Sequence, residues 1–356
     1  MANSLAVHGY AAASAKAPLG PFAFERRAPG PRDVVIDILY CGVCHSDIHQ
    51  ARDEWGGSIF PMVPGHEIVG RVSAIGGEVA AFRPGDFAGV GVLVDSCRVC
   101  ENCREGLEIY CPQNVPTYNG RDKSGAATYG GYSSRIVVDE AYTLRITHPP
   151  EQLAAVAPLL CAGITTYSPL RHWGAGPGKT VGIIGLGGLG HMGVKLAHAL
   201  GARTVLFTTS KGKVADGHRL GADAVVLSTD ASAMRSHLRS LDFILDTAAG
   251  FHDLNPYLGL LKRDGTLALV GVPPQPFTVA PFSLISGRRS LAGSAVGGMR
   301  ELQEMLDFCA ARGIVSDIEI TPISAVNQAF ERVVRGDVKY RFVIDLATLG
   351  GGSEVP

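Results

Sequence analysis

Half of the eight cysteines in this 356-residue chain lie within fifteen residues. They are Cys97, Cys100, Cys103 and Cys111, with the spacing C-x2-C-x2-C-x7-C. Thiolates this close together can bind one tetrahedral zinc ion, and four cysteine ligands leave it no open coordination position. The alternatives are a disulfide pair, a redox-active CxxC and an iron–sulfur cluster. We expect a structural metal site that stabilises a long polar loop.

Three further residues have side chains suited to a second metal site. Cys44 lies in "CGVCHSDIHQ", His66 in "PGHE" and Cys161 in "LLCAGITTY". Two thiolates and one imidazole leave the fourth position of a zinc ion open to water or substrate, as in catalytic sites. Taken singly, each residue has another explanation, since a cysteine in an apolar run is usually a buried core thiol. The three lie about 22 and 95 residues apart, so spacing alone does not assemble them.

A glycine-rich loop predicts a nucleotide site. "GIIGLGGLGHMG" contains Gly185, Gly187 and Gly190 in the pattern G-x-G-x-x-G. The motif follows an apolar run and opens an amphipathic helical pattern, which is the context in which it binds a dinucleotide. The glycines allow a tight turn and let backbone N–H groups at the helix N-terminus approach a pyrophosphate. A glycine turn with a purely structural role is the alternative.

The end of the next predicted strand indicates which dinucleotide is bound. NAD-binding folds normally carry an Asp or Glu there, which bonds the ribose 2′-hydroxyl. This chain reads "VLFTTSKGK", with Thr208, Thr209, Ser210, Lys211 and Lys213. No carboxylate would repel a 2′-phosphate, and hydroxyl and ammonium groups could bind one. We predict NADP(H) rather than NAD(H); even if the two lysines only form a solvated turn, the missing acid favours the same cofactor.

The sequence pattern divides the chain into a β-rich part and an α/β part. The first 150 residues contain short β-branched runs bounded by Gly, Pro and Asp, at 33–42, 67–76, 86–94 and 132–139. Six predicted strands then alternate with helical stretches such as 191–201 and 233–240, which is typical of a doubly wound parallel sheet and an α/β fold. These strands are 180–185, 203–209, 223–228, 241–247, 265–272 and 289–295. The tail has helices at 299–313 and 325–336 and a strand at 339–346, which we expect to pack on the first part.

Composition excludes several classes of function. The chain is 46% apolar and 18% charged with a net charge of −1, which describes an ordinary globular protein. No apolar run reaches the ~18 residues of a membrane span. Near-neutral charge without basic runs offers nothing to nucleic acid. The start of the chain has no basic segment followed by an apolar run, so we expect no export and a cytoplasmic location, where cysteines serve metals or catalysis before disulfides.

The chain resembles the zinc-dependent medium-chain alcohol dehydrogenases, and among them the cinnamyl-alcohol dehydrogenase-like branch of bacterial NADP-dependent aldehyde reductases. The matching segments are "CGVCHSDIHQ", "PMVPGHEIVGRV", "SCRVCENCREGLEIYC", "GGYSSRIVV", "LLCAGITTYSPLRHW", "GIIGLGGLGHMGVKLAHALGA", "LFTTS" and "GDVKYRFVID". They run from Cys41 to Asp345 and so cover most of the chain. The resemblance implies a GroES-like catalytic domain at 1–152 with a structural zinc lobe at 95–113, a Rossmann NADP-binding domain at 153–295, and a C-terminal segment at 296–356 that returns to the catalytic domain.

The resemblance also implies two zinc ions per subunit. Cys44, His66 and Cys161 would bind the catalytic zinc, with Glu67 beside it as an outer or transient ligand. Asp47 would be the carboxylate that orients His66. The four clustered cysteines match the structural zinc lobe of the family. Polyol-dehydrogenase relatives typically have Glu at the position of Cys161, which disfavours that branch.

The same resemblance assigns the cofactor and substrate contacts. Residues expected at the cofactor are His45, Thr165, Gly185, Leu186, Gly187, Gly188, Leu189, Gly190, Thr208, Thr209, Ser210, Lys213 and Arg341. His45 and Arg341 resemble positions that face the pyrophosphate. Trp55, with Gln50, Leu93 and Tyr118, would line a pocket for flat or apolar aldehydes, although Trp55 could equally be packing.

The implied reaction is hydride transfer between NADP(H) and a primary alcohol or aldehyde. Zinc would act as a Lewis acid on the carbonyl oxygen. Ser46 and His49 match the family's proton relay, which runs through the nicotinamide ribose, and a histidine near its ordinary pKa suits the outer end. The rival readings are an NAD-dependent polyol or sugar dehydrogenase and a catalytically silent protein that binds zinc and nucleotide. By resemblance we expect a homodimer formed through sheet edges around residues 289–295, with a small-molecule substrate and no nucleic acid or membrane partner.

Overall fold

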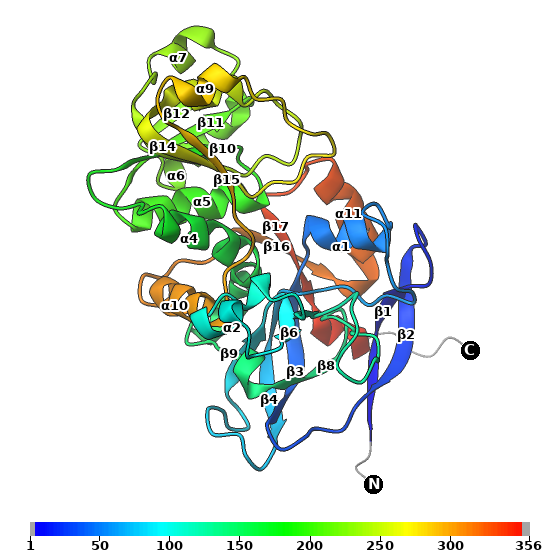
Figure 1. Cartoon of the computed structure of the whole chain (residues 1–356). Coiled ribbons are helices and arrows are strands. Elements are labelled where there is room, and N and C mark those ends of the chain that lie inside the picture. The colour runs from blue at the N-terminus through cyan, green and yellow to red at the C-terminus, as the bar shows by residue number, and fades with distance from the viewer. Residues whose placement is uncertain (1–3, 351–356) are drawn as a thin grey trace. The chain divides into compact units, whose positions relative to one another are not determined.

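The computed structural model describes residues 4–350, and the chain divides into two compact units. One unit contains the residues up to Cys161 together with those from Gly297 onward, and the other runs from Ala162 to Val296. In Figure 1 the blue and red ends of the colour range therefore both belong to the first unit, and green to yellow mark the second.

The first unit is built on a seven-stranded sheet with the order β16-β17-β3-β4-β5-β9, which β8 joins by pairing with β3. β3 (Asp33–Gly42) pairs with three neighbours, and most of its side chains are buried. This matches its near-continuous apolar sequence. The other strands are β4 (Ile68–Ile75), β5 (Phe87–Val90), β8 (Arg135–Asp139), β9 (Leu144–Arg145), β16 (Ile318–Pro322) and β17 (Arg341–Asp345). Its core includes Ile36, Ile68, Tyr132, Phe330 and Ile344.

Two small antiparallel pairs complete the strands of this unit. β1 (Leu5–Ala12) and β2 (Leu19–Arg26) pair along their whole length, and β6 (Leu93–Asp95) pairs with β7 (Val115–Pro116). The sequence pattern did not predict β1 and β2. Their sequences, "LAVHGYAA" and "LGPFAFER", contain one β-branched residue between them, so the strand signal is weak.

The helices of this unit are short except in the tail. They are α1 (His45–Ala51), α2 (Glu101–Glu105), α3 (Leu153–Val156), α10 (Met299–Ala310) and α11 (Val326–Val334), with 3-10 turns η1 (Glu108–Tyr110), η2 (Glu140–Tyr142), η3 (Pro150–Gln152), η4 (Ala157–Leu160), η6 (Ile323–Ala325) and η7 (Leu346–Gly350). The tail contributes to the sheet of this unit, because β17 pairs antiparallel with β3 through Val343 and Gly42. The blue and red ribbons thus meet in one sheet (Figure 1).

The second unit is a six-stranded sheet with the order β12-β11-β10-β13-β14-β15, in which every neighbouring pair is parallel. This is the 3-2-1-4-5-6 order of a dinucleotide-binding fold, so the predicted fold class is confirmed. The strands are β10 (Thr180–Ile184), β11 (Arg203–Thr208), β12 (Ala224–Leu227), β13 (Leu241–Asp246), β14 (Leu261–Leu269) and β15 (Ser290–Gly293).

One helix precedes these strands and others connect them. They are α4 (Ala162–His172), α5 (Gly188–Ala199), α6 (Val214–Arg219), α7 (Ala231–Arg235), α8 (Asn255–Leu260) and α9 (Pro281–Ile285), with the 3-10 turn η5 (Lys211–Lys213). α4 and α5 pack against each other (Figure 1). The helix predicted over 233–240 is shorter and begins earlier, because α7 ends at Arg235. Five non-helical residues, 236–240, then lead to β13, and one of them, Arg239, has a φ of +54°.

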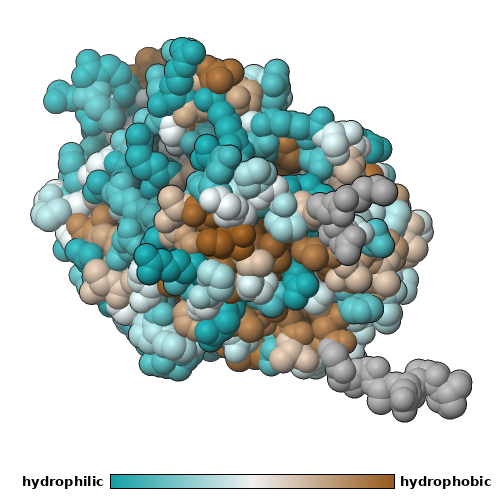
Figure 2. Space-filling view, turned by 90° about the horizontal axis from the view of Figure 1, so that it is seen from below, coloured by the Kyte–Doolittle hydropathy of each residue, from teal (hydrophilic) through white to brown (hydrophobic). Residues whose placement is uncertain are grey.

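The surface of the described residues is mixed. Figure 2 shows one face with hydrophilic groups over much of its area and hydrophobic groups gathered near its centre. Single exposed apolar residues are normal for folded proteins. Among residues 4–350, no helix is by itself long and apolar enough to cross a membrane; only the bent pair Pro150–Leu160 and Ala162–His172 meets the length and composition criteria together.

Candidate active site

The structure brings Cys44, His66, Glu67 and Cys161 together inside the first unit. Their ligand atoms all lie within 4.8 Å of one another, and all four residues are buried. Cys44 is the N-cap of α1, the His66–Glu67 pair directly precedes β4, and Cys161 follows η4. Three different elements therefore supply the groups that sequence spacing could not assemble.

The donor set fits a zinc ion. Ligand bonds of about 2.3 Å in tetrahedral geometry put two zinc-bound sulfurs about 3.8 Å apart, and the Sγ atoms of Cys44 and Cys161 are 3.8 Å apart. His66 Nε2 and Glu67 Oε2 are buried, and neither has a hydrogen-bond partner among residues 4–350. Such orphaned polar atoms are costly unless a ligand satisfies them.

Asp47 links the segments that carry these ligands. It is completely buried and accepts hydrogen bonds from the N–H of Cys44 (2.9 Å), the N–H of Gly65 (3.1 Å) and the hydroxyl of Tyr132 (3.0 Å). Its Oδ1 lies 3.9 Å from Nδ1 of His66, beyond hydrogen-bond distance. Asp47 therefore acts on the ligands mainly through the backbone beside Cys44 and His66, rather than through the direct imidazole contact expected from the sequence.

Tyr132 is itself held against the loop that carries His66. Its N–H donates to the Pro64 carbonyl at 3.0 Å, and the N–H of Gly131 donates to the Gly65 carbonyl at 2.8 Å. Gly65 has φ of +105°, and a Cβ there would lie 2.7 Å from the ring of Tyr132. Only glycine allows this close approach.

Burial and mutual charge shift the pKa values of the ligand groups. Burial disfavours the imidazolium of His66, but the Cys44 thiolate and the Asp47 carboxylate outweigh it and raise the pKa of His66 to about 9. The hydrogen bond from Cys161 lowers the pKa of Cys44 well below its ordinary value. The same interaction, together with burial, raises the pKa of Cys161. A metal ion binds the deprotonated forms, so its binding must release protons.

Glu67 is paired with Arg341, which the sequence analysis had placed at the cofactor pyrophosphate. The guanidinium of Arg341 donates to Glu67 Oε1, and both side chains are almost completely buried. Burial raises the pKa of Glu67 to about 8, while the charge of Arg341 opposes that shift. The Nε of Arg341 is buried and has no hydrogen-bond partner in the described part of the chain, so one donor is left for another group.

α1 also carries the predicted relay residues. Ser46 Oγ lies 3.6 Å from Cys44 Sγ. His49 Nδ1 lies 2.5 Å from Glu54 Oε2, and its ring stacks on Trp55 with centroids 4.8 Å apart. Trp55 is 51% exposed, so its contact with His49 is the clearest role that the geometry gives it.

The remaining pocket candidates lie at different depths. Tyr118 is buried and stacks on His66 with centroids 5.7 Å apart and an interplanar angle of 11°. Its hydroxyl and Gln50 Oε1 are buried, and neither has a partner in the region from 4 to 350. Burial, helped by the charge of Asp47, raises the pKa of Tyr118. Leu93 is buried in β6. His45 is exposed at the start of α1, with its ring 6.1 Å from that of His49.

The four clustered cysteines form a second site of the predicted kind. Their Sγ atoms lie within 4.8 Å of one another, with Cys103 at 3.8 Å from Cys97 and 3.5 Å from Cys100. The backbone N–H groups of Val99 and Cys100 lower the pKa of Cys97 to about 6. All eight cysteines are free, so the disulfide alternative does not describe this structure. A tetrahedral metal ion fits the four sulfurs.

The glycine loop of the second unit has the geometry of a phosphate cradle. Gly185 follows β10 with φ of +88°, and Gly187 is the N-cap of α5. A Cβ on Gly190 would overlap the Gly185 carbonyl and lie 2.9 Å from Thr247 Oγ1, whereas a Cβ on Gly187 would meet nothing within 4 Å. Among the described residues no side chain caps α5, and its first turn has no acid, so its N–H groups can receive an anion.

The segment after β11 lies beside this loop. Lys213 Nζ donates to the Leu186 carbonyl at 2.8 Å, and the Ser210 N–H donates to Thr208 Oγ1 at 3.2 Å. Thr209 and Arg235 line a cavity of about 500 Å³ beyond the strand ends. Thr165 is buried in α4.

Sequence reasoning assigned no role to several residues that the geometry singles out. Tyr132 lies in the matching segment "GGYSSRIVV", but only the fold brings its hydroxyl to Asp47. Glu54 lies five residues after His49 beyond the end of α1, and Ser96 directly precedes the first clustered cysteine. For Glu54 and Ser96, the signal in the sequence was a carboxylate or hydroxyl close to a predicted relay or ligand residue.

Comparisons with known proteins agree with this geometry. Residues 30–148 match the alcohol dehydrogenase GroES-like domain, and residues 188–311 match the zinc-binding dehydrogenase domain. The chain is 61% identical over 339 residues to aldehyde reductase YahK of Escherichia coli (strain K12), covering 94% of this chain and 97% of that protein.

Two solved structures share the whole fold. A cinnamyl alcohol dehydrogenase from Sorghum bicolor, SbCAD4, has a TM-score of 0.93 and 44% identity, covering 99% of both chains. The CAD from Helicobacter pylori complexed with NADP(H) has a TM-score of 0.90 and 41% identity, covering 97% of this chain and 99% of that one. The chain therefore belongs to the zinc-dependent alcohol dehydrogenase family, with a GroES-like domain and a zinc-binding dehydrogenase domain, and is an oxidoreductase.

Proposed function

We propose that the chain is an NADP(H)-dependent alcohol dehydrogenase and aldehyde reductase acting on primary alcohols and aldehydes of aromatic, cinnamyl or medium aliphatic type. One observation carries this proposal: Cys44, His66 and Cys161 converge with the sulfur spacing of a zinc site and leave His66 Nε2 unsatisfied. Three protein ligands of this type leave one zinc position for substrate. The name of the 61% identical relative, an aldehyde reductase, supports the substrate class.

The chain's own residues would position the reacting groups. Zinc held by Cys44, His66 and Cys161 would supply Lewis acidity for the carbonyl oxygen, and NADPH would supply the hydride. Asp47 fixes the backbone beside both ligand segments. Glu67, paired with Arg341, offers its free Oε2 to the same centre. Glu67 is thus an outer group that can approach the metal without first losing its counter-ion.

Ser46 and His49 are proposed to move the proton between the substrate oxygen and solvent through the nicotinamide ribose. Glu54 accepts from His49 Nδ1, which holds the imidazole with Nε2 free to exchange a proton. The tautomer follows from that contact, because a carboxylate only accepts. Trp55, Gln50, Leu93 and Tyr118 remain the proposed pocket residues, and the unpartnered Tyr118 hydroxyl supports a polar contact there.

The phosphate loop and the segment after β11 are proposed to bind NADP(H). The loop residues 185–190 would take the pyrophosphate at the N-terminus of α5, and Thr208, Thr209, Ser210 and Lys213 the adenosine side, with Thr165, His45 and Arg341 as further contacts. Support comes from the cradle geometry, the absence of an acid at the end of β11 and the NADP(H) complex of the Helicobacter pylori relative.

We further propose residues 1–152 with 296–356 as the catalytic domain and 153–295 as the nucleotide-binding domain. β15 ends the parallel sheet, and near it α9 exposes Phe282 and Ile285 (76% and 67%), which supports a homodimer formed through this edge. Two thiolate clusters need a compartment that keeps them reduced, for which we propose the cytoplasm.

NADPH oxidation against an aldehyde panel tests the function. Zinc-replete protein should reduce cinnamaldehyde, benzaldehyde or medium aliphatic aldehydes, should carry two zinc ions by elemental analysis, and should prefer NADPH to NADH. Cys44→Ser should abolish reduction and leave NADPH binding near wild type. Turnover of sorbitol with NAD would instead support the polyol reading, and no turnover of any aldehyde would refute the proposal.

Two variants test the cofactor and assembly proposals. Charge reversal in Lys213→Glu should weaken NADPH relative to NADH, because it adds a negative charge near the 2′-phosphate. Phe282→Asp should convert a dimer to a monomer by light scattering. An unchanged cofactor preference in Lys213→Glu would show that Lys213 does not bind the 2′-phosphate. A wild-type protein that is monomeric in light scattering would refute the proposed dimer.

A further inference from the structure

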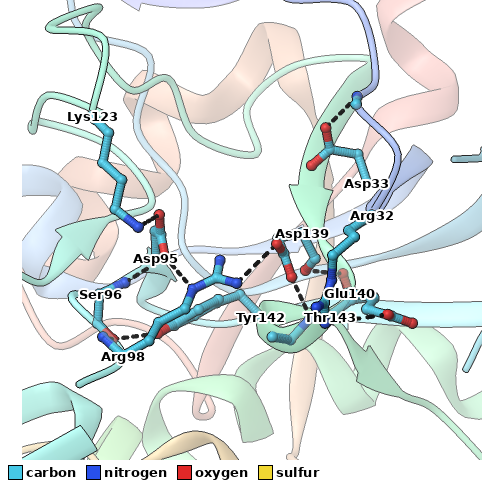
Figure 3. A network of polar contacts seen from close by, with 12 residues as sticks. Arg32, Asp33, Asp95, Ser96, Arg98, Lys123, Asp139, Glu140, Tyr142 and Thr143 are labelled. Atoms are coloured by element: carbon cyan, nitrogen blue, oxygen red, sulfur yellow. Dashed lines mark hydrogen bonds and ion pairs between the residues drawn. The ribbon is translucent and has the colours of Figure 1, made fainter. Parts of the chain in front are cut away.

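Ser96 lies between β6 and the first clustered cysteine, and its side chain is completely buried. It stands at one end of a polar network in the first unit that includes Asp95, Arg98, Asp139 and Tyr142 (Figure 3). Neither the family comparison nor the cysteine spacing assigns it a role.

The hydroxyl of Ser96 has a complete set of partners. Its Oγ accepts from the Tyr142 hydroxyl at 2.5 Å and from the Arg98 N–H at 3.2 Å. Its third neighbour is Cys103 Sγ, at 3.1 Å. A serine hydroxyl has two acceptor lone pairs and one proton. Because Tyr142 and Arg98 occupy the lone pairs, the proton must go to the sulfur of Cys103.

The cysteine at the end of this series of hydrogen bonds independently fixes its direction. A zinc-bound cysteine is a thiolate and has no proton to donate, so Cys103 accepts from Ser96. Tyr142, which lies beside Ser96 in Figure 3, in turn donates to Ser96, so the hydrogen bonds run from Tyr142 through Ser96 to Cys103.

Arg98 holds this path in place. It is a non-glycine residue with φ of +65°, and that backbone turn directs its N–H to Ser96. Its guanidinium bonds Asp95 at 2.9 Å and Asp139 at 3.0 Å and lies 5.3 Å from the centre of the Tyr142 ring (Figure 3). The unfavourable φ is thus compensated by two ion pairs and a cation–π contact.

We propose that Ser96, oriented by the hydrogen bond from Tyr142, donates a hydrogen bond to the thiolate of Cys103 and thereby slows the loss of zinc from the four-cysteine site. Both are positioning residues, since neither touches the metal. A zinc ion with four thiolates carries a net charge of about −2, so a hydrogen bond to one sulfur stabilises part of this negative charge. Outer hydrogen bonds of this kind typically change metal affinity about 10- to 100-fold.

The test follows zinc loss from each site separately in the zinc-replete full-length protein. Wild type, Ser96→Ala, Tyr142→Phe and the double variant are exposed to a chelator, and freed thiols are trapped with iodoacetamide at time points. Mass spectrometry then distinguishes Cys97, Cys100, Cys103 and Cys111 from Cys44 and Cys161. Tyr129→Phe, a ring packed on Phe24, and Ser316→Ala, a buried serine in the tail, are the matched controls.

Each single variant should speed alkylation of the four-cysteine site about tenfold and leave the Cys44–Cys161 site at the wild-type rate. The double variant should match Ser96→Ala, because Tyr142 acts only through that hydroxyl. A purely structural role would instead give additive effects and would loosen both zinc sites together. Additive effects, equal loss from both sites, or wild-type rates in both variants would each overturn the proposal. Should Ser96→Ala fail to fold, Tyr142→Phe alone still tests the proposal, because faster alkylation confined to the four-cysteine site supports it, whereas equal loss from both sites or a wild-type rate overturns it.

Discussion

Changing each of the three glycines of the phosphate loop to alanine should impair either stability or NADPH binding, for a different physical reason in each case. A Cβ on Gly190 would overlap a backbone carbonyl that cannot move away cheaply, so Gly190→Ala should destabilise the unliganded protein. Gly187→Ala meets nothing within 4 Å and should leave that protein unchanged. Gly185→Ala has room, but it must hold φ near +88°.

The magnitudes follow from these environments. Overpacking typically costs about 1–3 kcal/mol, and at about 2–4 °C per kcal/mol for a domain of 150–250 residues, Gly190→Ala should lower Tm by roughly 2–12 °C. A left-handed φ costs a residue with a Cβ about 1–2 kcal/mol, so Gly185→Ala should lower Tm by roughly 2–8 °C. For Gly187→Ala the expected Tm change is within about 2 °C, since the advantage of glycine over alanine at an N-cap is offset by the smaller conformational entropy of alanine in the unfolded chain.

For NADPH affinity the order of the variants should be reversed, so that Gly187→Ala loses the most. If the pyrophosphate approaches the backbone at Gly187, a methyl group there costs about 1–3 kcal/mol of binding, or about a 5- to 150-fold higher Kd for NADPH. Thermal unfolding without cofactor and NADPH fluorescence titration measure the two effects separately. Gly176→Ala, outside the motif and with only an ordinary contact at 3.7 Å, is the matched control.

Two results would refute this reasoning. If Gly187→Ala lowered the Tm of the unliganded protein as much as Gly190→Ala, the local packing that separates the two glycines would be misdescribed. If Gly187→Ala bound NADPH as wild type does, the dinucleotide would not approach α5 at its N-cap.

Three further predictions concern single groups. Tyr132→Phe should remove one of three hydrogen bonds to the buried Asp47 carboxylate, costing about 1.5–3 kcal/mol in urea unfolding; a wild-type unfolding midpoint would exclude this role. His252 lies 3.1 Å from buried Asp246, and that contact raises the pKa of His252. The pair's contribution is therefore complete below a pH of about 6.5 and disappears as pH rises through the folded-state pKa, so the Tm advantage of wild type over His252→Gln should shrink above neutrality, and a constant difference would contradict it. Because the pKa of His66 is raised to about 9, zinc binding to the metal-free protein should release protons and tighten from pH 7 to 9, as calorimetry in buffers of different ionisation enthalpy would show; no proton release would count against the site.

The sequence by itself determined the features that depend on residues close together in the chain. The C-x2-C-x2-C-x7-C spacing predicted one cluster of four sulfurs because a short loop can bring them within reach of one ion. The alternation of apolar strands and helices predicted the parallel sheet of the second unit because each β-α-β unit is defined over about thirty residues. The glycine spacing predicted the turn from β10 into α5 for the same reason.

Only the tertiary structure decided which distant residues meet. Cys44, His66 and Cys161 come from three elements, and their convergence depends on how β4, α1 and η4 pack in the first unit. The pairing of Glu67 with Arg341, 274 residues away, follows from β17 joining β3. No local pattern records such contacts, because burial and hydrogen-bond satisfaction are properties of the packed core.

Two further features were decided only by the tertiary structure: the hairpin of β1 and β2, and the path from Tyr142 through Ser96 to Cys103. The two strands have only one β-branched residue between them and are stabilised by each other, and the path needs η2 to lie beside the cysteine loop. The sequence determines which ligand and hydrogen-bonding groups are present. The distances between them are set only when segments far apart in the chain are buried together.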